Sequence, residues 1–164
     1  METLYDRLLA ENERWVAAFD RSRLTAPPVL GLAVVACMDA RITVEDMLGL
    51  RSGDAHIIRN AGGLATEDAI RSLIVSQQLL GTTEVLVIGH TRCGMLSLAE
   101  DEVHARLAAE SGVDVALPLL EFHDLAENVR RQLAIVRSHP WLKRDAPVHG
   151  LIYDVETGRL QPVE

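Results

Sequence analysis

Two short stretches place cysteine, histidine and charged side chains directly after strand-like apolar runs. CMDAR (37–41) follows the run at 29–36, and HTRCG (90–94) follows the run at 84–89. The chain has two cysteines, one in each stretch. Thiolate and imidazole are ligands that zinc prefers, and three protein ligands leave a fourth position for water or substrate. The candidate zinc ligands are Cys37, His90 and Cys93.

Each part of this pattern also has a plainer interpretation. A cysteine after an apolar strand is commonly just a small buried hydrophobic residue, and an H-x-x-C spacing alone is a weak signal. Iron–sulfur clusters commonly use four cysteines, and a thioredoxin-type redox site needs C-x-x-C, which is absent. Two cysteines at equivalent strand ends, one with a histidine partner, favour zinc, while the buried-thiol interpretation stays open.

Asp39 and Arg41 follow Cys37 closely enough to face the same cavity. A bidentate arginine would orient the carboxylate and hold it ionised. Such a carboxylate can accept a hydrogen bond from a zinc-bound water and direct the lone pair of the hydroxide. The alternative is a structural salt bridge at a strand–helix junction.

A further loop, RNAGG (59–63), ends the next strand-like run. Its candidate anion-binding residues are Asn60, Gly62 and Gly63, because paired glycines can expose backbone N–H groups toward an anion. The alternative is a tight turn before the helix that starts near Thr66.

The apolar periodicity predicts how these stretches are positioned. We expect strands at 29–36, 55–60 and 84–89, and helices at 2–20, 42–50, 69–80, about 95–111 and about 118–138. The tail (148–163) is expected to form two short strands. This alternation predicts one α/β domain spanning 1–164, with a mostly parallel central sheet flanked by helices and a C-terminal edge strand or hairpin. Sites in such sheets gather at the carboxyl ends of strands, where both cysteines and RNAGG lie. The zinc ligands can meet only if the first and third strands are neighbours.

Composition excludes several classes of protein. With 164 residues the chain is long enough to bury a core. A net charge of −8 argues against a nucleic-acid partner, because phosphate binding needs clustered cations. No apolar run approaches the roughly 20 residues that span a bilayer, so no membrane partner is expected. The acidic N-terminus does not resemble a secretory signal, so we expect a cytoplasmic protein whose cysteines are free thiols or metal ligands and not a disulfide.

The three stretches CMDAR, GDAHIIRNAGG and GHTRCGM, in this order, resemble the β-class carbonic anhydrases. The tail GLIYDVETGRL is also similar, so the resemblance covers residues 30–160; Ala40 stands where many members have serine. It implies one zinc ion per chain, held by Cys37, His90 and Cys93. It further implies that Asp39 and Arg41 form a catalytic dyad, and it favours a RNAGG loop that lines the site near bicarbonate.

The activity implied is carbonate dehydratase: reversible hydration of CO2 to bicarbonate and a proton through a zinc-bound hydroxide. Alternatives are a carbonyl sulfide or carbon disulfide hydrolase on the same scaffold, or a catalytically silent zinc-binding protein. In one resting form associated with the family, the aspartate at the position of Asp39 binds zinc directly and closes the site.

Family habit further implies a homo-oligomer, a dimer or a tetramer, in which the N-terminal segment (1–24) packs on a partner subunit. The plain alternative is that this helix packs on its own core. A proton must also leave in each cycle, and histidine is its natural carrier near neutral pH. The candidates are His56, His104, His123, His139 and His149.

Overall fold

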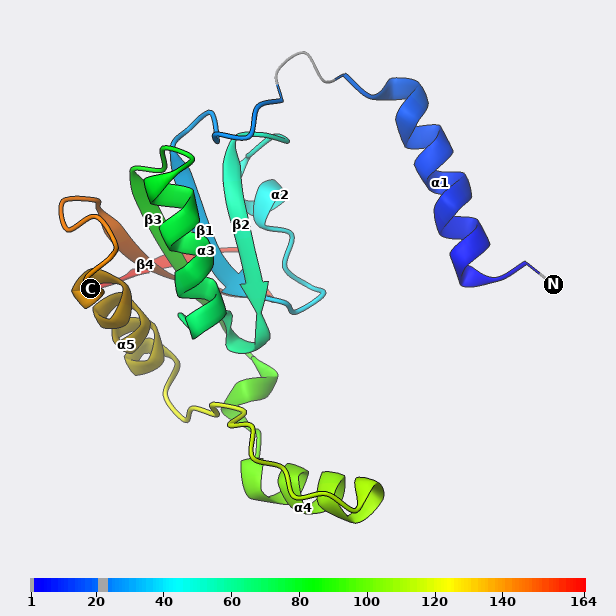
Figure 1. The fold of residues 1–164 in the computed structure, drawn as a ribbon, viewed down its shortest axis with the longest axis vertical. Helices are drawn as coiled ribbons and strands as arrows, with labels where there is room; N and C mark the ends of the chain where they lie inside the picture. The colour runs from blue at the N-terminus through cyan, green and yellow to red at the C-terminus, as the bar shows by residue number, and fades with distance from the viewer. Residues whose placement is uncertain (1, 21–23) are drawn as a thin grey trace.

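One five-stranded sheet forms the centre of the protein in the computed structural model, which describes residues 2–20 and 24–164 (Figure 1). The strands are β1 (Leu32–Cys37), β2 (Ala55–Asn60), β3 (Glu84–His90), β4 (Val148–Tyr153) and β5 (Leu160–Val163). Their order is β2-β1-β3-β4-β5. All neighbouring pairs are parallel except β4 and β5, which form an antiparallel hairpin. The predicted mostly parallel sheet with a C-terminal hairpin is confirmed.

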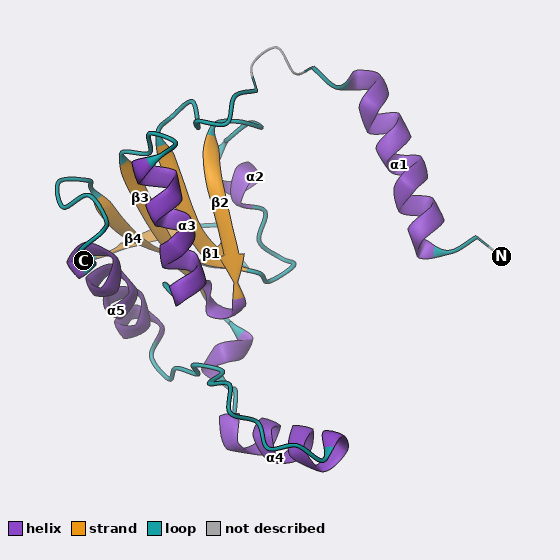
Figure 2. Ribbon diagram, viewed as in Figure 1, coloured by secondary structure: helices purple, strands orange, loops and turns teal. Residues whose placement is uncertain are grey.

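Helices lie on both faces of this sheet (Figure 2). On one face α3 (Glu67–Gln78) and α5 (Leu125–Ser138) pack against alternate residues of β1 and β3. On the other face Ile42 and the short helix α2 (Val44–Leu48) pack near Val34 and Ile88. Because both faces are covered, residues 33–37 of β1 form a continuous run of buried residues.

Several predicted boundaries were wrong around α4 and α5. The helix predicted from residue 95 is instead a short 3-10 turn, η2 (Gly94–Leu96), followed by α4 (Glu100–Ser111). The helix predicted from 118 begins at Leu125, where the Asp124 side chain caps the helix by accepting from the Glu127 amide at 2.9 Å.

The chain before α5 is not helical because its backbone N–H groups donate hydrogen bonds to the Glu100 carboxylate. The N–H groups of Leu119 and Leu120 donate to Glu100 at 2.9 and 3.0 Å. These groups are therefore satisfied without an intrahelical partner. Leu120 also has a left-handed backbone, with φ of 64°, which a helix cannot contain.

The N-terminal helix α1 (Leu4–Ala18) stands away from the sheet (Figure 1). Thr3 and Asp6 cap its start reciprocally. No residue of α1 is buried in the single chain, which argues against packing on its own core. The large exposed apolar side chains of this region are Leu4, Tyr5, Leu8, Leu9, Trp15, Val16 and Phe19. Residues 1 and 21–23 of the predicted segment 1–24 lie outside the described residues. In the part of the chain described, no helix is both long and apolar enough to cross a membrane.

Candidate metal centre

Cys37, His90 and Cys93 meet at the carboxyl ends of β1 and β3. These strands are neighbours, with Ala36 in register with Ile88, as the predicted site required. The three ligand atoms all lie within 4.8 Å of one another, and all three residues are buried. Both cysteines are free thiols. The structure thus brings together residues that are 53 and 3 positions apart in the chain (37 to 90 and 90 to 93).

The His90 ring presents a free nitrogen to this group. Its Nδ1 lies 2.9 Å from the Thr91 carbonyl oxygen, which can only accept, so Nδ1 carries the hydrogen. Nε2 therefore has a lone pair, and it is buried with no hydrogen-bond partner. A buried polar atom without a partner is costly, and a histidine ligand fixed through its other nitrogen is the usual arrangement at metals. His90 fits a metal ligand.

The surroundings of the two cysteines also favour binding of a cation, because they stabilise a thiolate at Cys37. The Cys93 thiol donates to the Cys37 sulfur, and this hydrogen bond is the main cause that lowers the pKa of Cys37 below its usual value. Backbone N–H groups of Asp39 and Gly62 act in the same direction. Sharing the hydrogen, together with burial, raises the pKa of Cys93. Two thiols and one imidazole fit zinc.

Asp39 lies beside the group and is held by Arg41. The carboxylate accepts from Arg41 Nε at 2.9 Å, from Nη2 at 2.7 Å and from the backbone amide at 3.0 Å. These bonds hold the pKa of the Asp39 carboxyl well below its usual range. Asp39 Oδ2 is 3.9 Å from His90 Nε2. An ionised acceptor therefore stands at the edge of the three ligands, bound to Arg41.

Arg59 contributes contacts that sequence reasoning missed. From β2, its Nε donates to the Cys37 carbonyl at 2.9 Å and its Nη2 donates to the Asp39 carbonyl at 2.7 Å. It thereby fixes the backbone of the CMDAR turn on both sides of Met38. The available signal was its place at the end of a strand that pairs with β1, opposite Ala36.

The RNAGG loop packs directly against the ligands. Asn60 uses its side-chain amide to close the turn, donating to the Leu64 carbonyl and accepting from the Leu64 amide, both at 2.8 Å. Gly62 and Gly63 are left-handed, with φ of 81° and 65°. A Cβ on Gly63 would lie 2.9 Å from the Cys37 nitrogen, so only glycine allows this approach. Contact of the three predicted residues with substrate stays a prediction.

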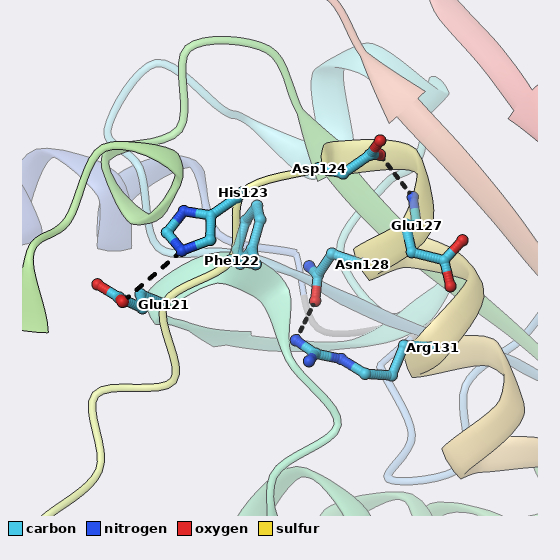
Figure 3. A pocket seen from close by; sticks show the side chains of 7 residues that line it. All are labelled: Glu121, Phe122, His123, Asp124, Glu127, Asn128 and Arg131. Atoms are coloured by element: carbon cyan, nitrogen blue, oxygen red, sulfur yellow. Dashed lines mark hydrogen bonds and ion pairs between the residues drawn. The ribbon is translucent and has the colours of Figure 1, made fainter.

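None of the other five histidines belongs to the metal-binding group found among the described residues. His123 lines a cavity of about 310 Å³ at the start of α5, with its Nε2 3.8 Å from Glu121 (Figure 3). Phe122, its neighbour in sequence, packs in the same buried cluster as Cys37 and Cys93. His56 bonds to Ser76 near the opposite ends of the strands. The predicted proton carrier stays unassigned.

Comparison with known proteins agrees with this geometry. Residues 32–119 match the family model for carbonic anhydrase. The chain is 40% identical over 161 residues to beta-carbonic anhydrase 1 of Mycobacterium tuberculosis, covering 98% of each chain. It is 37% identical over 172 residues to a carbon disulfide hydrolase of Acidithiobacillus thiooxidans, covering 92% of this chain and 84% of the relative.

A solved structure gives the same picture. The carbonic anhydrase from Streptococcus mutans superposes with a TM-score of 0.94 at 39% identity, covering 100% of this chain and 99% of that one. Members of the β class are zinc enzymes, and the Cys37–His90–Cys93 group is a metal site of the matching kind. With its fold, its buried donors and relatives along its whole length, the chain belongs to the β class of the carbonic anhydrase family.

Proposed function

We propose that the protein is a zinc-dependent carbonic anhydrase that reversibly hydrates CO2 to bicarbonate and a proton. The observation that carries the proposal is an ionised Asp39, clamped by Arg41, 3.9 Å from the free Nε2 of His90. When bound, zinc supplies a Lewis acid that lowers the pKa of a coordinated water to about 7.

The residues of the site would then have separate roles in the reaction. Cys37, His90 and Cys93 would hold the ion, and two thiolates with a neutral imidazole would leave the centre without net charge. Asp39 accepts a hydrogen bond from the O–H of the attacking oxygen and so directs its lone pair at the carbon of CO2. Arg41 keeps Asp39 ionised and aligned for this single role.

In this proposal, the loop of Asn60, Gly62 and Gly63 lines the site and supports the metal ligands. The Gly62 amide favours the charged form of Cys37, and Gly63 lets the loop approach the ligands closely. Asn60 holds the loop closed through Leu64. The loop thus forms one wall beside the bicarbonate product.

A second candidate function is hydrolysis of carbon disulfide, favoured by the 37% identity to the Acidithiobacillus thiooxidans enzyme. Carbon disulfide and carbonyl sulfide are linear and electrophilic at carbon, as CO2 is, so the same nucleophile can attack them. A silent zinc-binding role is disfavoured, since structural zinc usually has four protein ligands and the described residues provide three.

We further propose a cytoplasmic homo-oligomer, a dimer or a tetramer, of single-domain chains spanning residues 1–164. The exposed apolar side chains of α1 support it, because a helix with this much apolar surface gains by packing on a partner subunit. Light scattering on the wild type and on Leu8→Glu/Trp15→Glu tests this: the wild type should exceed the mass of one chain and the variant should dissociate. A monomeric wild type would contradict it.

Stopped-flow CO2 hydration by the zinc-loaded protein, run beside assays of sulfide release from carbon disulfide and carbonyl sulfide, tests the activity. We expect CO2 hydration that rises between about pH 7 and pH 9, as the nucleophile loses its proton. No CO2 hydration in this range, with zinc bound, would overturn the first function, and sulfide release alone would establish the second.

A further inference from the structure

Arg92, between two of the metal ligands, has an uncommon backbone conformation. Its φ is 54°, in the left-handed region, and only one other non-glycine residue in the described part of the chain, Leu120, has a positive φ. A long side chain gains nothing from this conformation, and it persists only where the surroundings hold it in place.

The left-handed backbone directs the Arg92 carbonyl at the catalytic dyad. Arg41 Nη2 donates to the Arg92 oxygen at 3.0 Å and to Asp39 Oδ2 at 2.7 Å. The same guanidinium nitrogen therefore joins the acidic partner to the metal-ligand turn. Because the Arg41 side chain is 47% exposed, this second acceptor limits how it can swing into solvent.

The C-terminal hairpin holds the turn in this conformation. The Thr91 amide donates to the Tyr153 carbonyl at 2.9 Å, and the Thr91 hydroxyl accepts from the Val155 amide at 3.1 Å. The Arg92 side chain pairs with Glu156 at 2.9 Å. These contacts come from the last residue of β4 and the turn that follows it, and they lie on either side of the left-handed residue.

We propose that Arg92 is a positioning residue whose carbonyl oxygen keeps Arg41 on Asp39, and so keeps Asp39 off the metal. Asp39 Oδ2 is already within 3.9 Å of His90 Nε2, so a small rotation brings the carboxylate to the ligands once Arg41 releases it. The inference rests on the proposed function, and it deepens that function by naming the contact that holds the site open.

Two substitutions at the same position separate the carbonyl from the side chain. Arg92→Gly and Arg92→Val both remove the guanidinium and its pair with Glu156. Glycine keeps a left-handed backbone without strain, whereas β-branched valine resists it and turns the carbonyl away from Arg41. Glu156→Gln removes only the ion pair. The readouts are bound metal, kcat for CO2 hydration, and the visible absorption spectrum of the Co²⁺-substituted protein, which reports the fourth ligand.

We expect all variants to bind one metal ion. Arg92→Val should lower kcat by about tenfold or more, and its cobalt spectrum should change as a carboxylate replaces solvent. Arg92→Gly and Glu156→Gln should keep the wild-type spectrum and stay within about twofold in kcat. Adding Asp39→Asn to Arg92→Val should reverse the spectral change, because the competing ligand is removed.

An Arg92→Val protein with the wild-type spectrum and kcat would overturn the inference, and so would an Arg92→Gly protein that changes as much as Arg92→Val. If Arg92→Val does not fold, Arg92→Ala, with its smaller left-handed penalty, takes its place: a spectrum identical to that of Arg92→Gly would then overturn the inference. If the wild type does not hydrate CO2, the proposed function fails, and the cobalt spectra still decide the role of Arg92.

Discussion

Arg41 binds the Asp39 carboxylate through both of its oxygens, with Nε 2.9 Å from Oδ1 and Nη2 2.7 Å from Oδ2. This pairing decides the state of the candidate site. A carboxylate engaged with a guanidinium in this way would leave an ion held by Cys37, His90 and Cys93 accessible to a further ligand. The Asp39 side chain is thus engaged with Arg41 in this structure, as the proposed function requires.

Asp39→Asn is expected to retain bound metal and to lower kcat about 100-fold, because the amide no longer offers an ionised acceptor. Metal analysis and stopped-flow CO2 hydration measure the two effects. Asp46→Asn, which removes an exposed acid on α2, is the matched control and should behave as wild type. Full activity of Asp39→Asn would remove Asp39 from the mechanism.

Cys37→Ala should lose metal while keeping the fold, since it removes one of three donors and leaves His90 and Cys93 as an incomplete site. Metal content after dialysis, with circular dichroism as the check on folding, measures this. A Cys37→Ala protein that keeps stoichiometric zinc would show that the ion is held elsewhere.

Arg59→Ala should lower kcat and speed loss of metal to a chelator, because the Cys37 and Asp39 carbonyls lose the donor that fixes their turn. We expect about a tenfold effect on each rate, since small misplacements at a reacting centre are costly. Arg71→Ala removes an exposed arginine paired with Asp68 on α3 and serves as the control. Equal behaviour of the two variants would argue against a role for Arg59.

Gly63→Ala should destabilise the fold more than Gly112→Ala. Both glycines are left-handed, with φ of 65° and 73°, so both substitutions cost about 1 kcal/mol of conformational energy. At Gly63 the new Cβ also meets backbone atoms of Cys37 and Ile88 at 2.9 and 3.0 Å, whereas nothing lies within 4 Å at Gly112. We expect an additional cost of about 1–3 kcal/mol at Gly63, measured by denaturant unfolding. Equal losses would contradict the close approach.

Glu100 should make the chain before α5 sensitive to acid. The amides of Leu119, of Glu121 and of Leu120 lower the pKa of its carboxyl in the folded protein. A lowered pKa means that this stabilisation is fully present above the unfolded-state value, about 4.3, and is lost as the pH falls through the folded-state value. The protection factors of the Leu119 and Leu120 amides in hydrogen exchange, taken relative to the unstructured chain at the same pH, should therefore fall below about pH 4. Glu100→Gln should already exchange fast at neutral pH, and an unchanged rate would show that these amides are protected in another way.

The local patterns of the sequence determined the sheet, the helices on its faces and the identity of the candidate metal donors. Buried strands are continuous apolar runs, and the donors follow two such strands directly, so their meeting point was predictable once β1 and β3 were taken as neighbours. Thr66, at the start of α3, was likewise recognisable as an N-cap, because it is a threonine followed directly by the acidic residues Glu67 and Asp68.

Tertiary structure alone decided the contacts that join distant segments. The non-helical conformation of the segment before α5 depends on the carboxylate of Glu100 in α4, and no periodicity within that segment reveals this contact. The hydrogen bonds of Arg59 and of the Arg92 carbonyl need the relative placement of three strands and a left-handed backbone. The proposed competition between Arg41 and a metal ion for the Asp39 carboxylate would depend on those same contacts, because a hydrogen-bond donor and a cation a few ångströms apart would both attract one carboxylate, and geometry at that scale is set by packing.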